Sequence, residues 1–187
     1  MNKLIAVVGM AGSGKSIATD YLESQGWNKI YFGGVIYDRM RKEGIEITPD
    51  SQKQYREALR KEHGMGVIAK ILKDDIIAAY QEKDTVLDGL YSWDEYLILK
   101  EEFGSKLKLI CVCCDKDIRY QRIATRKDRP FNNKDIIIRD CAEIENSAKG
   151  GPIAFADYYI FNNGNLDEYI TRLNEILKKI TTTEGEK

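Results

Sequence analysis

Residues 4–16 read LIAVVGMAGSGKS, and most of the fold can be predicted from them. The apolar run at 4–8 is rich in β-branched residues and favours a buried strand. It is followed by Gly-x-x-x-x-Gly-Lys-Ser, a pattern typical of a phosphate-binding loop. Beyond the loop, apolar side chains recur at helical spacing, at Ile17, Ala18, Tyr21 and Leu22. The stretch therefore predicts a strand, a phosphate-binding loop and a helix in succession.

The loop pattern has a direct chemical explanation. Backbone N–H groups must turn inward around a phosphate, and glycine permits the positive φ angles and the close approach that this needs. The helix that follows points the positive end of its dipole at the anion. Lys15 is expected to reach the β- and γ-phosphates of ATP as a catalytic group, and the Ser16 hydroxyl to ligate Mg²⁺. The expected ATP-binding residues of this stretch are Gly9, Met10, Ala11, Gly12, Ser13, Gly14, Lys15, Ser16 and Ile17.

The composition predicts one domain with balanced charge. At 187 residues the chain can bury a real core, and we expect one domain at residues 1–180 and a flexible tail at 181–187. The 29 basic and 30 acidic residues give a net charge of −1, which suggests neither a nucleic-acid nor a membrane partner. No apolar run approaches the roughly 20 residues of a membrane span, and residues 1–3 leave no room for a signal peptide, so a cytoplasmic location is expected. The four cysteines are expected to be buried, reduced thiols.

Apolar runs that alternate with amphipathic stretches predict an α/β fold. The expected strands are residues 4–8, 28–32, 85–89, 107–114 and 158–161. The expected helices are residues 15–25, 35–43, 49–62, 67–80, 92–103, 115–127, 134–148 and 166–180. This alternation indicates a five-stranded parallel sheet with helices on both faces, the three-layer fold of P-loop NTPases. Ligands bind such sheets at the carboxyl ends of the strands.

Asp88 ends the third expected strand and precedes Gly89. A second acid near the phosphate-binding loop is needed to complete the Mg²⁺ shell, usually through water. The alternative is an aspartate that only caps a helix or shapes the turn before Gly89. We predict that Asp88 and Ser16 hold the metal and that Asp88 is catalytic.

Arginines recur from the sixth expected helix into a polar loop, and this pattern favours a lid over residues 126–148. Phosphoryl transfer builds up charge on the moving group, and arginines that close over it stabilise that charge and exclude water. We expect Arg126 and Arg129 to act in catalysis and Arg122 to bind the triphosphate. The alternative is a solvated helix face with local salt bridges.

The long connection between the second and third expected strands predicts a helical insert at about residues 34–82. Such a lobe suits the binding of an acceptor, and Arg39 and Arg60 are the predicted acceptor-binding residues. His63 is left out of catalysis, because a capping or packing role is more common. A guanine-reading Asn-Lys-x-Asp motif is missing, which argues against a GTPase switch.

The motifs together resemble the dephospho-CoA kinase and adenylate kinase group of P-loop nucleotide kinases. The residues that carry the resemblance are 5–16, the Val-Leu-Asp-Gly at 86–89, the arginine-rich lid and the segment ADYYIFNNG at 156–164. Uncharacterised, mainly archaeal adenylate-kinase-related proteins are the most similar, and they share the EHGMG pattern of residues 62–66. The resemblance implies that ATP and Mg²⁺ are the cofactors and that Asn162, Asn163 and Gly164 lie beside the adenine.

Two positions differ from the group and bear on the acceptor. Dephospho-CoA kinases carry an acid after the second strand that can act as the base on a hydroxyl, whereas this chain has Gly33-Gly34. The group also places an arginine after Asp-Gly, where it can grip the acceptor phosphate; this chain has Tyr91 there, which weighs against a phosphate acceptor. A phosphate acceptor needs no base, so the sequence favours a kinase that phosphorylates a small nucleotide-like phosphate. The alternatives are a dephospho-CoA kinase with another base, such as Asp38, and a nucleotide-binding regulatory module with slow hydrolysis.

Overall fold

The computed structural model describes residues 2–126 and 132–184. The strands are β1 Leu4–Val8, β2 Asn28–Tyr31, β3 Thr85–Asp88, β4 Leu107–Cys113 and β5 Tyr158–Phe161. The α-helices are α1 Lys15–Ser24, α2 Gly34–Lys42, α3 Pro49–His63, α4 Val67–Glu82, α5 Trp93–Phe103, α6 Lys116–Ala124, α7 Asn133–Glu145, α8 Gly150–Ala154 and α9 Leu166–Glu184. A 3₁₀ turn at Gly104–Lys106 follows α5.

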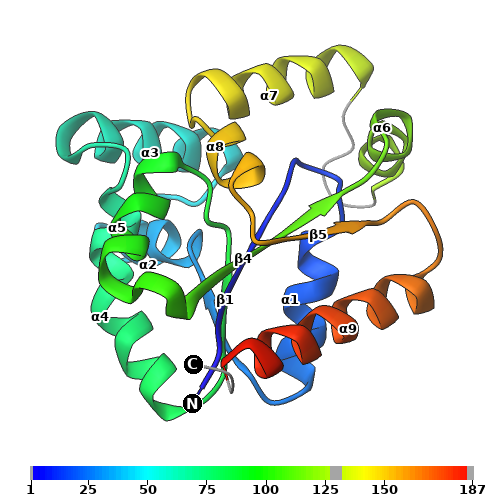
Figure 1. Cartoon of the computed structure of the whole chain (residues 1–187). Coiled ribbons are helices and arrows are strands. Elements are labelled where there is room, and N and C mark those ends of the chain that lie inside the picture. Colours follow the sequence, from blue (N-terminus) through cyan, green and yellow to red (C-terminus); the bar gives the residue numbers. More distant parts are fainter. Residues whose placement is uncertain (1, 127–131, 185–187) are drawn as a thin grey trace.

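The five strands form one parallel sheet in the order β2-β3-β1-β4-β5, as predicted (Figure 1). β1 is central, and all five of its side chains are buried. Its register places Val7 opposite Asp88 of β3 and Val8 opposite Cys111 of β4. The chain turns to opposite sides of the sheet from β1, so the loop after β1 opens at the switch point where such folds bind ligands.

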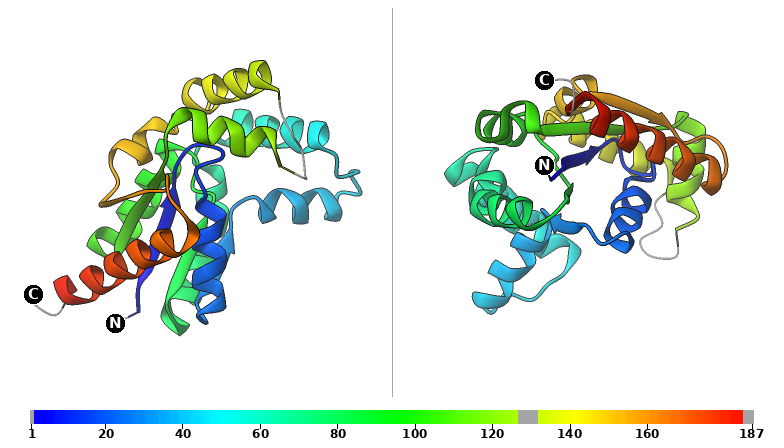
Figure 2. Two further views of the ribbon diagram at one scale, coloured as in Figure 1. Left: turned by 90° about the vertical axis from the view of Figure 1, so that its right-hand side faces the viewer. Right: turned by 60° about the horizontal axis from the view of Figure 1, so that its bottom comes forward.

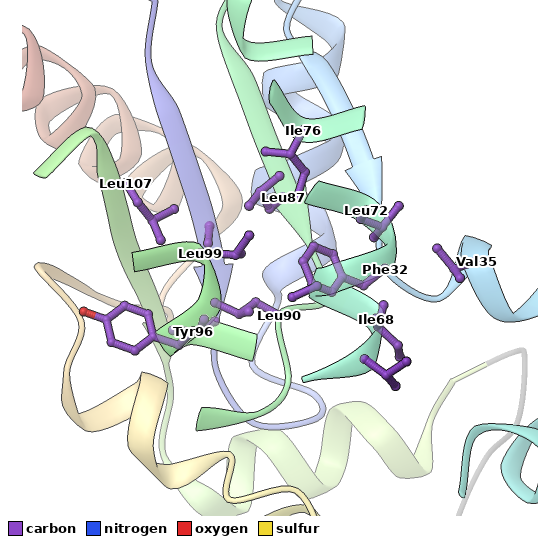
Figure 3. Packing of buried hydrophobic residues seen from close by; sticks show 14 of the residues in the cluster. Phe32, Val35, Ile68, Leu72, Ile76, Leu87, Leu90, Tyr96, Leu99 and Leu107 are labelled. Carbon is purple, nitrogen blue, oxygen red and sulfur yellow. The ribbon is translucent and has the colours of Figure 1, made fainter. Parts of the chain in front are cut away.

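The insert helices and α5 cover one face of the sheet. Apolar side chains of α4 and α5 pack there against β1, β3 and the residue after β2. Figure 3 shows Ile76 and Leu99 gathered with Leu87 and Phe32 in this cluster. Full burial of each such side chain contributes about 1.5–3 kcal/mol, so the insert is stabilised by the same core as the sheet.

The opposite face is covered by α1 and α9. Ala18 and Leu22 of α1 pack there against Ile5 and Val7 of β1. The buried side chains of α9 recur every three or four residues, at Tyr169, Leu173, Ile176 and Ile180. Figure 2 shows α9 lying along the sheet beside α1, which completes the three layers. None of the helices that the structure describes is long and apolar enough to cross a membrane.

Helices α6 and α7 lie beyond the carboxyl ends of the strands (Figure 1). A small cluster joins them to the loop after β1, because Ile123 of α6 and Ile136 of α7 pack against Ala11. The segment between them, residues 127–131, is outside the described residues. Helix α7, which lies in the predicted lid region, thus packs directly on the phosphate-binding loop.

Several predicted helix ends were wrong. Helix α6 stops at Ala124, before the predicted residue 127, and a turn at Thr125 follows. The predicted helix 134–148 is α7, which ends early at Glu145; Ala148 then adopts a left-handed φ of 48°, and the short helix α8 that follows was not predicted. Helix α9 continues to Glu184 beyond the predicted Ile180, into the segment expected to be a tail. No glycine or proline interrupts it, and buried Ile180 anchors its last turns.

The cysteines agree with the prediction only in part. All four are free thiols. Cys111 is buried in β4, Cys113 and Cys114 are half-buried, and Cys141 is exposed on α7.

Candidate active site

The loop between β1 and α1 requires glycine where the chain passes close to other elements. Gly12 has a φ of 82°, and a Cβ atom there would lie 2.8 Å from the Arg119 carbonyl oxygen. Gly14 has a φ of 103°, and its Cβ would lie 2.3 Å from the Asn162 amide nitrogen. A side chain at either position would strain the backbone and would also clash with its neighbour. The two glycines therefore allow α6 and the residue after β5 to pack closely against the loop.

Three side chains hold the loop from outside by donating hydrogen bonds to its carbonyl oxygens. Arg119 Nη1 donates to the Ala11 oxygen at 3.0 Å. Asn162 Nδ2 donates to the Ser13 oxygen at 2.9 Å, and Tyr169 donates to the Gly14 oxygen at 3.1 Å. These donors lie on α6, after β5 and on α9. They fix the orientation of the peptide planes, which leaves the N–H groups available on the other side of the loop.

The loop has the unsatisfied donors that a triphosphate needs. Within the described chain, the N–H groups of Gly12, Gly14 and Ser16 have no hydrogen-bond partner. The Ser13 hydroxyl is buried and also has none. Buried polar groups are rarely left unpaired in a folded protein. The residues present therefore fit a phosphate chain, which would satisfy these donors.

Lys15 lies at the centre of a buried group of charges. Its ammonium donates to the Met10 oxygen at 3.0 Å. Burial and the Lys149 ammonium lower the pKa of Lys15 to about 7, while the Glu143 and Asp88 carboxylates act in the opposite direction. A lysine held in this way becomes fully charged when an anion arrives, because a bound phosphate would offset the cost of burial.

Asp88 lies at the carboxyl end of β3, beside the start of α1. Burial raises its pKa, although Lys29, a hydrogen bond with Thr19 and the Lys15 ammonium lower it. Thr19 is one helical turn beyond Ser16, so Asp88 lies beside the part of α1 that carries the exposed Ser16. No cluster of three or more acidic, histidine or cysteine side chains that could hold a metal occurs in the described residues. A Mg²⁺ ion here would rely on Ser16, Asp88, water and the phosphates, which is usual for this ion.

An arginine pair from α3 faces the same rim. Arg60 is only 10% exposed and donates to Glu95 at 3.3 Å, while its Nε has no partner among the described residues. Arg56 lies one turn before it and makes no ion pair with any described residue. Burial and the nearby Arg60 charge lower the pKa of Arg56, whereas Tyr91 acts in the opposite direction. Like charges four residues apart on a helix repel one another, and a bound anion would offset this repulsion.

Glu95 is the anchor of this arginine pair. Its side chain is fully buried, and it accepts hydrogen bonds from the Tyr91 and Ser92 N–H groups at 2.8 and 3.0 Å. Burial raises the pKa of Glu95, whereas the Arg60 charge and these hydrogen bonds lower it. The segment after Asp88 is therefore tied to α3 through one carboxylate.

The three arginines predicted to act from α6 and the lid have different surroundings in the structure. Arg122 of α6 has a buried Nη1 without a partner among the described residues, close to Cys114 and Tyr169. Arg126 is exposed after α6, within electrostatic reach of Arg139 and Glu143. Arg129 is outside the described residues.

Two predictions about the insert and one about the end of β5 are qualified by the contacts. Arg39 lies on α2 beside the Tyr55 hydroxyl, which donates to Glu43. Asp38 is exposed and pairs with Arg41, so it is not a base in the site. The Asn162 amide supports the loop, and the Asn163 side chain accepts the Asp115 N–H at 2.9 Å. A role of Asn163 and Gly164 beside adenine stays a prediction.

Several residues of the site were not predicted from the sequence. Arg56 could have been found, because it stands four residues before Arg60 on an expected helix. Glu95 could also have been found from the sequence, because Ser92-x-x-Glu95 is a capping-box pattern. Glu143 and Lys149 carry no such signal, because the fold alone brings the end of α7 to the loop.

Comparisons with known proteins agree with this architecture. The family described as AAA domain matches residues 5–146. A UPF0200 protein of Thermococcus onnurineus is 31% identical over 95% of this chain and 97% of its own length. Among solved structures, the shikimate kinase of Acinetobacter baumannii has a TM-score of 0.59 at 18% identity, over 98% of this chain and 95% of its own. A gluconokinase of Sinorhizobium meliloti has a TM-score of 0.55 at 17% identity, over 97% of both chains.

These similarities establish the kinase-like P-loop fold. The two kinase structures are under 25% identical to this chain, so they show its fold and nothing more. The narrower grouping with dephospho-CoA kinases is not confirmed by them. The match along almost the whole length of the Thermococcus protein identifies the family. The chain belongs to the UPF0200 family and has an AAA domain at residues 5–146.

Proposed function

We propose that this protein is an ATP-dependent kinase that transfers the γ-phosphoryl group to a small, phosphate-bearing, nucleotide-like acceptor. The observation that carries the proposal is the arginine pair Arg56 and Arg60, which shares one rim with Lys15 and Asp88. A cation pair for an acceptor next to a loop for a triphosphate is the arrangement that phosphoryl transfer needs.

On the donor side, the loop N–H groups and Lys15 would bind the β- and γ-phosphates. Mg²⁺ held by Ser16 and Asp88 would supply charge neutralisation for the phosphates. Arg122, Arg126 and Arg129 are proposed to approach the transferred group from the lid side. Cations on several sides lower the cost of the charge that spreads over the moving phosphoryl group.

On the acceptor side, the contacts favour a phosphate over a hydroxyl. A hydroxyl must lose its proton during the transfer, and Asp38 is exposed and paired elsewhere. The space over Gly33 is occupied by the Tyr31 ring, 2.4 Å from a Cβ built there. A phosphate is already ionised, and Arg56 would bind it while Arg60 stays tied to Glu95.

A hydroxyl acceptor is the second candidate, and Asp88 is the observation that supports it. Burial raises the pKa of this carboxyl, and a raised pKa suits a general base. The likeness to shikimate kinase and gluconokinase is compatible with this reading, because those proteins are named for small hydroxyl-bearing substrates. Dephospho-CoA belongs to the same class of acceptor.

The test is ADP release from Mg-ATP against a panel of acceptors. The panel contains the nucleoside and deoxynucleoside monophosphates, dephospho-CoA, shikimate and gluconate. We expect one monophosphate to raise ADP release at least a hundredfold over ATP alone. A response to dephospho-CoA or a sugar acid alone would support the hydroxyl alternative. Tight ATP binding without any responsive acceptor would contradict both and favour the nucleotide-binding regulatory module.

A further inference from the structure

Lys149 is a buried cation at the edge of the proposed transfer site. It precedes α8 and is only 2% exposed. Its ammonium donates to Glu143 Oε2 at 2.6 Å and lies 4.8 Å from the centre of the Tyr91 ring. Burying a lysine costs desolvation free energy. If Lys149 served only to join α7 to the start of α8, apolar side chains could do so without this cost. The burial of Lys149 therefore indicates a role other than packing.

The partner of Lys149 also touches the phosphate-binding loop. The Ala11 N–H lies 3.4 Å from Glu143 Oε2, the same oxygen that accepts from Lys149. The other oxygen of Glu143 accepts from Arg139 at 3.2 Å. One anionic oxygen is thus shared by a loop N–H group and an ammonium, which is how a phosphate oxygen is held in such loops.

Lys15 belongs to the same electrostatic cluster. Among the charged groups around it, Lys149 has the largest effect on its pKa, and Glu143 acts in the opposite sense. The two ammonium groups are therefore close to one another, with a single carboxylate near both. Asp88 is the other acid beside Lys15, and a bound phosphate would add the negative charge that keeps both ammonium groups protonated.

We propose that Lys149 is a second phosphate-binding lysine, and that Glu143 Oε2 marks the position that an oxygen of the transferred phosphoryl group takes on binding. This inference rests on the proposed kinase function and adds a substrate-binding residue to it. Binding of ATP then exchanges one anionic partner of Lys149 for another. Lys15 and Lys149 contact the phosphoryl group from the loop and from α8.

Substitution of Glu143 distinguishes phosphate binding by Lys149 from a purely structural ion pair between α7 and the residue before α8. In Glu143→Gln the competing carboxylate is gone while Lys149 remains, so Mg-ATP should bind about tenfold more tightly. In Glu143→Gln/Lys149→Met the buried pair is replaced by neutral groups, and this gain should be lost. The double variant also avoids a buried carboxylate without a partner, so it should fold.

The decisive readout is the preference for ATP over ADP, measured by calorimetric titration. If Lys149 meets the terminal phosphoryl group, the double variant should lose about tenfold of this preference relative to Glu143→Gln, the effect of one charge-assisted hydrogen bond. Glu143→Gln/Lys149→Arg should recover most of it. If the ion pair were only structural, the substitutions would change thermal stability, but Glu143→Gln and Glu143→Gln/Lys149→Met would prefer ATP over ADP equally. This result would overturn the inference.

A matched control is offered by another lysine–glutamate pair. Lys73 and Glu102 are 3.2 Å apart on the surface between α4 and α5. Lys73→Met/Glu102→Gln should bind both nucleotides as the wild type does. Failure of the wild type itself to bind Mg-ATP would contradict the proposed function, whereas normal wild-type binding with unchanged variants would contradict only the role of Lys149.

Discussion

The two sides of the candidate site are built in different ways. The loop side is held through its backbone, by three uncharged or cationic donors to the carbonyl groups of Ala11, Ser13 and Gly14. The acceptor side is held by a buried ion pair, Arg60 with Glu95. Backbone contacts tolerate few changes of geometry, whereas ion pairs can exchange partners. The difference suggests a rigid donor site facing an acceptor site that is adjustable by charge.

The largest effect is expected on the loop side, from Lys15→Ala. We expect ADP release in the presence of the acceptor to fall about a thousandfold, because the group that neutralises the β- and γ-phosphates is removed. The folded state should not suffer, since the lysine is buried at a cost. Steady-state kinetics and thermal melting measure the two quantities. Retention of turnover would contradict the mechanism, and Lys70→Ala on α4 is the control.

On the acceptor side, Arg56→Met should separate acceptor binding from nucleotide binding. We expect the KM for the acceptor to rise about thirtyfold while the Kd for Mg-ATP stays unchanged, because a charged hydrogen bond to a phosphate is lost. Kinetics at saturating ATP and a nucleotide titration give the two values. Arg41→Met, which removes an exposed arginine of α2, should change neither. An equal loss of ATP affinity would show that Arg56 belongs to the donor side.

The backbone support of the loop can be weakened by Asn162→Ala. This change leaves the Ser13 oxygen without its donor, and we expect about tenfold weaker Mg-ATP binding, from a loss of about 1–2 kcal/mol. Asn165→Ala is a suitable comparison, because it removes the cap contact to Glu168 without reaching the loop. It should lower the melting temperature but not the ATP affinity. Equal ATP binding by both variants would contradict a rigid, side-chain-supported loop.

The smallest effect is a pH dependence that tests the charge cluster. Lys15 must be protonated to hold a phosphate, and burial and Lys149 lower its pKa to about 7 in the free protein. Binding above this pH must take up a proton, so Mg-ATP affinity should fall about fivefold from pH 7 to pH 8. Calorimetry in buffers of different ionisation heat measures the proton uptake. A flat profile would contradict the shift.

The same shift has a definite sign for stability. The folded protein binds fewer protons at Lys15 than the unfolded chain between pH 7 and pH 10.5, so the free energy of unfolding should rise with pH across this window. Lys15→Met should remove this contribution. Chemical denaturation of both proteins at several pH values measures it.

The candidate site was predictable from the sequence to very different degrees. Gly9, Gly14 and Lys15 stand at fixed spacing in a local motif, so their arrangement could be predicted before any contact was known. Arg60 was found only as one of several basic residues, and its partner Glu95 was not connected to it. The two lie on separate helices, and no local pattern links them.

Local sequence determined the elements of this protein, since apolar periodicity, capping residues and glycine spacing act over a few neighbouring residues. The five strands, the phosphate-binding loop and the α3 cap at Thr48 all follow from such patterns. The charge cluster of Lys15, Glu143 and Lys149 depends on how α7 and α8 return to the loop. Its energy comes from burial and from long-range contacts, and these exist only once the sheet and its covering helices are packed.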